Sequence, residues 1–295
     1  MIDLNEKKIV SKGRLGPGEI LGVRIEKGKV YSNDEIKNYL SKEYKHYNNQ
    51  IIDLDKKLET ENEKVEIEGS DLRNFQHCFG YSIEDLELIL HPMAEDAKEA
   101  TGSMGDDTPL AVLSDKYRPL YHYFRQNFSQ VTNPPIDSLR ENKVMSLKTR
   151  FGNLGNILDF SKLTKDNIYV LNSPVLSNAQ FERFIKFFGN NNKVLDCTFN
   201  KDEDLESSIN QLKLKAEQAV REGIKQIILS DKNISENKMP MPMLLCIGAI
   251  NTHLVKLGLR GYVSINVQTG DALDTHSFAT LIGVGATTVS YTHLR

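Results

Sequence analysis

A regular alternation of short apolar runs and amphipathic segments fills residues 168–289 and constrains the fold more than any other feature of the sequence. Five runs are typical of buried strands: 168–171, 194–199, 227–229, 262–267 and 286–289. The segments between them have helical periodicity. Parallel strands need such helical crossovers, so the sequence predicts an α/β fold with a parallel sheet in the C-terminal half, either open or part of a barrel.

Start and stop signals place the intervening helices. Ser177 with Gln180 predicts a capping box, followed by apolar residues at helical spacing and a stop at Gly189. Further helices are expected at 205–219, 243–257 and 274–282.

The first fifty residues carry a hairpin signal and one helix. Residues 20–25 and 29–31 are rich in strand-forming residues, and Ser32 with Glu35 predicts a helix from about Asn33. A hairpin and one helix cannot bury their apolar faces alone, so we expect this segment to be the end of a larger domain.

A charged stretch separates this segment from the rest. Residues 53–69 hold seven acidic and three basic residues and no aromatic one, which predicts a solvated linker or exposed helix. We therefore expect domains at 1–52 and 70–295, with the linker 53–69 between them. Ser82 with Asp85 predicts the next helix, which His91-Pro92 should end.

Residues 101–141 have no sustained helical or strand period. Glycines, paired aspartates, aromatic residues interleaved with arginines, and the double proline Pro134-Pro135 follow one another closely. Such a composition favours irregular backbone shaped by its surroundings.

Composition excludes several classes of protein. The chain has 37 Lys and Arg against 40 Asp and Glu, a net charge of −3, which offers no basic excess for nucleic acid. No apolar run is long enough to span a membrane. Its three cysteines, without a secretory signal, predict a cytoplasmic protein.

Common catalytic motifs for dinucleotides, nucleoside triphosphates, zinc hydrolysis, serine hydrolysis and redox thiols are absent from the sequence. Polar residues at the strand ends could form a ligand site, although helix capping and turn formation are favoured for them: Asn172-Ser173, Asn200, Ser230-Asp231 and Gln268-Thr269-Gly270. A glycine turn is favoured over an anion site at 151–156, and structural roles are favoured for His253 and His276.

The segment 101–141 also holds candidate functional groups. Asp106 and Asp107 could bind a cation or act as acid and base, but capping of the following Thr108-Pro109 start is favoured. The aromatic cluster around His122 has the residues of a single-strand stacking surface, yet half-buried packing or an interdomain contact fits the acidic pI better.

Longer stretches carry a family resemblance. FGYSIEDLELIL at 79–90, TGSMGDDTPLAVLS at 101–114, LYHYFRQNFSQVTNPPIDSLRE at 120–141 and INVQTGDALDTHSFATLIGVGAT at 265–287 resemble the central domain of the glutamate synthase large subunit. GRLGPGEIL from Gly13 is similar to the end of that enzyme's glutamine amidotransferase domain.

The resemblance implies an enzyme that makes two glutamates from glutamine and 2-oxoglutarate, with ammonia channelled between two sites. It implies FMN and an iron–sulfur cluster in a synthase domain outside this sequence, and no cofactor within it. Its partners would be the amidotransferase and flavin domains of the same polypeptide, and ferredoxin or a small subunit that oxidises a reduced nicotinamide. The chain itself would join the two active sites and be inactive alone.

From the resemblance we expect no catalytic residue in this chain. We do expect Gly102, Ser103, Gly105, Asp106, Asp107 and Arg125 to lie at an interdomain surface that couples the sites, against the alternative that they only fix local backbone.

Two further expectations concern the ends of the sequence. Ser290–Arg295 departs from the family pattern and suggests a truncated or chimeric end, with a frayed fifth strand that leaves Val289 at an exposed sheet edge. The alternative to a piece of glutamate synthase is a free-standing α/β scaffold or binding protein that assembles with separate catalytic chains.

Overall fold

The computed structural model describes residues 6–43, 50–59, 69–99, 113–115, 117–125, 136–159, 161 and 166–291. The chain divides into two compact units, Met1–Asn49 and Gln50–Arg295. Among the described helices, none combines the length and the apolar character needed to cross a membrane.

The first unit contains the predicted hairpin and helix. Strand β1 (Gly22–Arg24) pairs antiparallel with β2 (Lys29–Tyr31), and Gly28 closes the connection with a φ of 58°. Helix α1 (Asn33–Glu43) starts at a capping box in which Ser32 and Glu35 exchange hydrogen bonds of 3.3 and 2.9 Å. No side chain described in residues 6–42 is buried.

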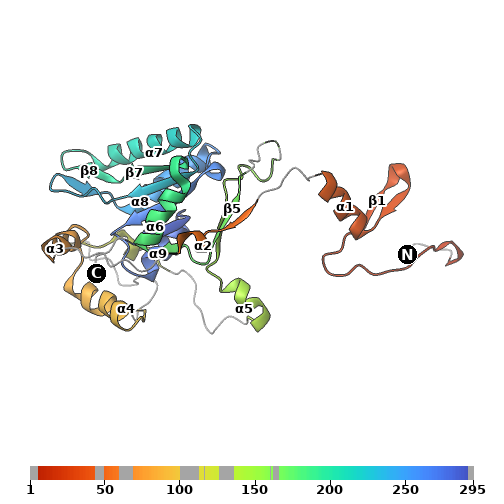
Figure 1. The fold of residues 1–295 in the computed structure, drawn as a ribbon, viewed down its shortest axis with the longest axis horizontal. Coiled ribbons are helices and arrows are strands. Elements are labelled where there is room, and N and C mark those ends of the chain that lie inside the picture. Colours follow the sequence, from red (N-terminus) through yellow and green to blue (C-terminus); the bar gives the residue numbers. More distant parts are fainter. Residues whose placement is uncertain are drawn as a thin grey trace. The chain divides into compact units, whose positions relative to one another are not determined.

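A five-stranded parallel sheet forms the centre of the second unit and confirms the α/β prediction (Figure 1). Its strands lie in the order β6 (Val175–Leu176), β12 (Thr288–Tyr291), β11 (Ser264–Thr269), β9 (Gln226–Ser230), β7 (Asn192–Asp196).

Helices cover both faces of this sheet. Ile227, Ile265 and Val267 face the larger core, which contains side chains from α7 (Leu205–Arg221), α8 (Met243–Lys256) and α9 (Thr275–Gly283). Ile228 points to the opposite face and packs with Phe181 and Phe184 of α6 (Asn178–Phe188). Alternate residues of β9 thus enter two different cores, as the strand's continuous apolar run predicts.

The predicted strand assignments need two corrections. The run 168–171 forms β5 (Ile168–Leu171), but β5 belongs to a separate sheet between β3 (Ile51–Asp53) and β4 (Thr149–Phe151), and β6 takes its place in the parallel sheet. The run 194–199 divides at Cys197 into β7 and β8 (Thr198–Asn200), which pairs with β10 (Lys238–Pro240). Apolar periodicity identifies strands but does not choose their partners, which explains both errors.

The C-terminal strand also differs from its expectation. β12 lies inside the sheet, between β6 and β11, and Val289 is fully buried. The expected exposed edge at Val289 is therefore wrong, because the short strand β6 covers it.

The charged stretch 53–69 is only partly described, and two leucines among its first residues are buried. Helix α2 (Asp55–Leu58) is short, and Leu54 and Leu58 are 0% and 1% exposed in the core beside α6. Their spacing of four residues puts both leucines on one helical face while the charged residues between them face outward. Residues 60–68 lie outside the described residues.

The helix after Ser82 continues past His91-Pro92, contrary to the prediction. The six-residue π-helical turn η3 (Asp85–Leu90) leads directly into α4 (His91–Glu95). Pro92 is the second residue of α4 and comes directly after this π-helical turn.

Three other described elements lie between β3 and β4 in the chain. They are α3 (Gly69–Cys78), the 3-10 turn η4 (Leu120–Tyr123) and α5 (Ser138–Val144). Asp137 caps α5 by accepting from the N–H groups of Leu139 and Arg140. The end of the segment predicted as irregular is therefore helical, while residues 101–112 and 126–135 lie outside the described residues.

Candidate functional site at the carboxyl edge of the sheet

The ends of β9 and β11 bring together two groups of polar residues that the sequence places far apart. Asp231 follows β9 and is 1% exposed. Its carboxylate accepts a hydrogen bond from the Thr269 hydroxyl and a weaker one, 3.3 Å, from the Gly270 N–H. The structure therefore joins the predicted strand-end residues Ser230-Asp231 and Gln268-Thr269-Gly270, and Asp231 caps no helix.

Asp271, which the sequence analysis missed, stands next to this pair. Its Oδ2 accepts hydrogen bonds from the Tyr121 hydroxyl at 3.2 Å and the Met243 N–H at 3.3 Å. Its own N–H donates to the Thr269 hydroxyl at 3.0 Å. A lone aspartate after a glycine does not indicate a functional site in the sequence. Only the fold brings η4 and α8 into contact with Asp271.

Burial controls the protonation of this cluster. It raises the pKa of Asp231 to about 7, with the charge of Asp271 adding to the effect and hydrogen bonds from Thr269 and Gly270 opposing it. Burial likewise raises the pKa of Asp271, and burial and the nearby Asp271 carboxylate raise the pKa of Tyr117 to about 12. Neither carboxylate forms an ion pair with any described lysine or arginine.

Two glycines make room for aromatic rings beside Asp271. A Cβ at Gly270 would stand 2.4 Å from the Phe79 ring, and one at Gly80 would stand 2.5 Å from the Tyr117 ring. The Tyr81 hydroxyl also donates to the Gly270 carbonyl at 2.7 Å. The segment around residue 80 is thus fitted closely against the end of β11.

Two cavities meet at these residues. One of about 590 Å³ reaches along η4 to the start of α9, and another of about 740 Å³ reaches toward β8 and β10. Phe79, Gly80, Tyr117 and Asp271 line both. Asp271 and the two aromatic residues therefore line both cavities of this unit.

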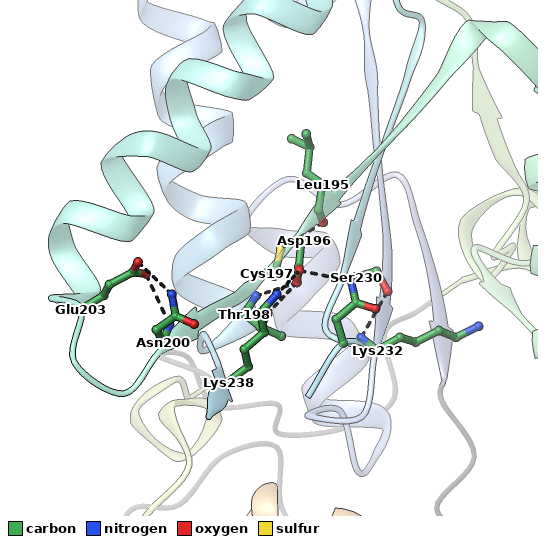
Figure 2. Close-up of polar contacts among 10 residues, drawn as sticks. Leu195, Asp196, Cys197, Thr198, Asn200, Glu203, Ser230, Lys232 and Lys238 are labelled. Atoms are coloured by element: carbon green, nitrogen blue, oxygen red, sulfur yellow. Dashed lines mark hydrogen bonds and ion pairs between the residues drawn. The ribbon is translucent and has the colours of Figure 1, made fainter. Parts of the chain in front are cut away.

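A second polar cluster lies at the end of β7 (Figure 2). Asp196 accepts from the Thr198 N–H at 3.0 Å, the Thr198 hydroxyl at 2.8 Å and the Asn233 side chain at 3.1 Å, and Lys238 stands 3.6 Å away. Burial works against ionisation, but these hydrogen bonds outweigh it and lower the pKa of Asp196. Every neighbour supports the ionised form, which is typical of a structural carboxylate.

The remaining strand-end residues have the turn-forming roles that the sequence analysis favours. The Asn172 N–H donates to Asp55 at 2.8 Å, and the Ser173 hydroxyl accepts from the Val175 N–H at 3.1 Å. The Asn200 side chain donates to Glu203 at 2.9 Å. Figure 2 shows this contact as a dashed line. These contacts fix loop backbone, as the sequence analysis favours for the three residues.

The histidines and the glycine turn also have structural contacts. His253 Nε2 lies 2.8 Å from Glu217, and His276 Nε2 lies 2.9 Å from the Tyr121 carbonyl. At 151–156 the Leu154 N–H donates to the Gly152 carbonyl at 2.9 Å and the Gly155 N–H donates to the Gly261 carbonyl at 3.0 Å, so both N–H groups are paired within the protein.

The predicted interdomain residues are mostly outside the part of the chain that the structure describes. Gly102, Ser103, Gly105, Asp106 and Asp107 fall there, while Arg125 is described and exposed. Their proposed role is not tested by the geometry.

Two of the three cysteines are buried and the third is exposed. Cys197 and Cys246 are buried neighbours, whereas Cys78 is exposed. Across the described residues, no three His, Cys, Asp or Glu side chains are grouped to hold a metal ion.

Comparison with known proteins gives the family. The profile of the glutamate synthase central domain matches residues 74–294. The chain belongs to this family. The profile of class-II glutamine amidotransferases matches residues 1–49, so both parts of the resemblance seen in the sequence are confirmed.

Relatives from bacteria and plants match almost the whole chain. It is 48% identical over 298 residues to the glutamate synthase [NADPH] large chain of Azospirillum brasilense and 38% identical to that of Bacillus subtilis. It is 39% identical to the chloroplastic ferredoxin-dependent glutamate synthase 2 of Arabidopsis thaliana. Each match covers 98% of this chain but 20%, 19% and 18% of the relative, so the chain spans about a fifth of their length.

Proposed function

We propose that this chain is the connecting part of a glutamate synthase large chain, which makes two glutamates from glutamine and 2-oxoglutarate with a reduced electron donor. The observation that carries the proposal is the match of the central domain over residues 74–294, preceded by an amidotransferase match over 1–49. In this proposal residues 1–49 end the glutaminase domain, and the α/β unit is a scaffold between it and a flavin synthase domain.

The scaffold role agrees with the geometry of the second unit. Its larger core packs α7, α8 and α9 against four strands, and the smaller core packs α2 and α6 against the opposite face. A rigid body of this kind can hold two active sites at a fixed separation and keep ammonia away from water. FMN, an iron–sulfur cluster, and ferredoxin or a nicotinamide-oxidising subunit belong in this proposal to the rest of the enzyme, which we place in the cytoplasm.

An exchange of domains tests the proposal. Residues 50–295 of this chain would replace the matching stretch of the Azospirillum brasilense large chain, and glutamine hydrolysis and glutamate formation would be measured together. We expect the hybrid to form glutamate from glutamine and 2-oxoglutarate at a rate proportional to glutamine consumed. A folded hybrid that hydrolyses glutamine without forming glutamate would contradict the connecting role.

The interdomain hypothesis for the segment after Thr101 is part of the same proposal. In the hybrid enzyme, Asp106→Asn combined with Asp107→Asn should lower the ratio of glutamate formed to glutamine hydrolysed, because the coupling surface loses two charges. Arg125→Gln should act in the same direction. If all three substitutions leave that ratio and the glutaminase rate unchanged, these residues only fix local backbone.

A further inference from the structure

The larger core of the second unit contains two cysteines that lie far apart in the sequence. Cys197 stands at the junction of β7 and β8 (Figure 2), and Cys246 is the fourth residue of α8. Both side chains are 0% exposed and belong to the same cluster of buried residues. Both are free cysteines in the structure, so two thiols meet in this core.

Main-chain hydrogen bonds bring the two cysteines together. The Cys197 N–H donates to the Ser230 carbonyl at 2.8 Å, and the Cys197 carbonyl accepts from the Met241 N–H at 2.8 Å. Met241 comes shortly before α8, and the Cys246 N–H donates to the Pro242 carbonyl at 3.2 Å in the first turn of that helix. The junction of β7 and β8 is therefore tied to the start of α8, which fixes the positions from which both thiols enter the core.

The two thiols are in contact with each other. Cys197 and Cys246 share a hydrogen bond, and that bond together with burial raises the pKa of Cys197 well above its usual range. The Cys197 Sγ also lies 3.7 Å from the Leu195 carbonyl oxygen, which is a weak contact. Two cysteines can form a disulfide only if their side chains point toward each other, and a hydrogen bond between the thiols meets that condition.

We propose that Cys197 and Cys246 are an oxidisable pair whose disulfide joins the β7–β8 junction to α8, with a peroxide as the oxidant. One sulfur attacks a peroxide oxygen and becomes a sulfenic acid, while the O–O bond breaks and the other oxygen leaves as water. The second sulfur then attacks the sulfenic sulfur and displaces its oxygen as a second water. The two thiol protons go to these waters, the sulfurs are oxidised and the peroxide is reduced.

Burial determines when this reaction occurs. A buried, protonated thiol reacts slowly, because the thiolate is the nucleophile and the oxidant has to reach it. Exposed Cys78 should therefore react first, whereas the buried pair should react in molecules whose core has opened locally. The disulfide would close a long loop of the chain, from the end of β7 to the first turn of α8. It should therefore stabilise the folded state once it has formed.

Peptide mapping of the 295-residue chain after treatment with hydrogen peroxide tests the pair. The reaction would be run in urea below the unfolding transition, where local opening is frequent. The digest should contain a peptide in which Cys197 is linked to Cys246, whereas the same treatment in guanidinium should also link each of them to Cys78. A folded chain without the Cys197–Cys246 peptide would overturn the proposal, as would links to Cys78 in the proportions found in guanidinium.

Thermal unfolding measures what the disulfide does to the fold. In a Cys78→Ser chain, oxidation should raise the midpoint by about 4–16 °C, and dithiothreitol should reverse the rise. Cys246→Ala in the same background is the matched control, because Cys197 alone cannot form a bond within the chain and the midpoint should not respond to peroxide. If that variant does not fold, the reversal by dithiothreitol carries the comparison. A linked chain whose midpoint is unchanged or lower would overturn the proposal that the bond fastens α8 to the junction.

Discussion

At the scale of single residues, the second unit contains two carboxylates with opposite electrostatic surroundings. Asp231 is buried next to Asp271, whereas Asp196 is surrounded by hydrogen-bond donors and Lys238. Both stand at the carboxyl end of a strand of the same sheet, so their difference comes from their neighbours and not from their position in the sequence. That difference predicts opposite dependences of stability on pH.

The ionisation of buried Asp231 lowers the stability of the folded chain at neutral pH, and Asp231→Asn should remove this effect. The folded-state pKa of Asp231 is raised from 3.8 to about 7, so its contribution to stability is fully present below about pH 4 and is lost as the pH rises toward 7. The loss is on the order of 4 kcal/mol for a shift of this size. Chemical denaturation at pH 5 and pH 7.5 should show a smaller difference in the free energy of unfolding for Asp231→Asn than for the parent chain.

Asp196→Asn is the control with the opposite sign. The folded-state pKa of Asp196 is lowered, so its stabilisation is present above the unfolded-state pKa and is lost as the pH falls through the folded value. This variant should be less stable than the parent at pH 7.5 and approach it in acid. An Asp231→Asn variant whose pH dependence equals that of the parent would show that Asp231 is ionised in the folded protein.

Gly270→Ala should destabilise the second unit because the added methyl group would clash with the ring of Phe79. Its Cβ would stand 2.4 Å from Phe79, and overpacking of this kind costs about 1–3 kcal/mol. Phe79→Ala removes the ring, so the double variant should lose less stability than the sum of the two single changes. Urea denaturation of all four chains measures this coupling.

Gly248→Ala is the matched control for that experiment. Gly248 lies inside α8, and a Cβ there would meet no atom within 4 Å. Alanine should therefore stabilise the chain by about 0.5–1 kcal/mol. Additive losses for Gly270→Ala and Phe79→Ala would mean that the ring does not occupy the space beside Gly270.

At the scale of elements, helix starts are the best-determined features of this fold. Ser177 and Gln180 form the predicted capping box of α6, with hydrogen bonds of 3.3 and 2.9 Å. Helix ends are less well predicted, since the helix after Ser82 passes Pro92 by way of a π-helical turn. A cap depends on residues within one turn, whereas the path beyond Pro92 depends on what the helix packs against.

Ser177→Ala should lower the free energy of unfolding of the second unit by about 1 kcal/mol, because the Gln180 N–H loses its side-chain acceptor. Ser177→Asp keeps an acceptor at the same position and should cost less. Guanidinium denaturation followed by circular dichroism compares the three chains. Equal losses for alanine and aspartate would rule out the cap as the source of the effect.

At the scale of the whole molecule, the two units differ in how much apolar surface they bury. Every described side chain in residues 6–42 is at least partly exposed, including Val10, Val23 and Ile25, whereas the second unit has two extended cores. Stability follows buried apolar area, so only the second unit has the means to fold by itself.

Separate expression of the two units tests this difference. Residues 50–295 should unfold in one cooperative thermal transition with the midpoint of the whole chain, and residues 1–49 should show no such transition. Differential scanning calorimetry of both pieces and of the whole chain measures these transitions and their midpoints. A cooperative transition in 1–49 alone would show that the hairpin and α1 do not need the remainder of an amidotransferase domain.

The sequence by itself determined the fold class, the helices of the C-terminal half, the hairpin, the caps at Ser32 and Ser177, and the family. These features depend on local propensity, on periodicity within a single element, or on long ordered matches, all of which one sequence contains. The candidate interdomain residues from Gly102 to Asp107 stay a prediction, because they lie outside the described residues.

Only the tertiary structure decided which strands pair and which side chains meet. It assigned β5 to a separate sheet, buried Leu54 and Leu58 within a charged stretch, and brought Asp271 against Tyr121 across 150 positions of sequence. Partners this far apart are selected by the packing of whole elements, and neither the apolar period of a strand nor the identity of a lone aspartate encodes that choice locally.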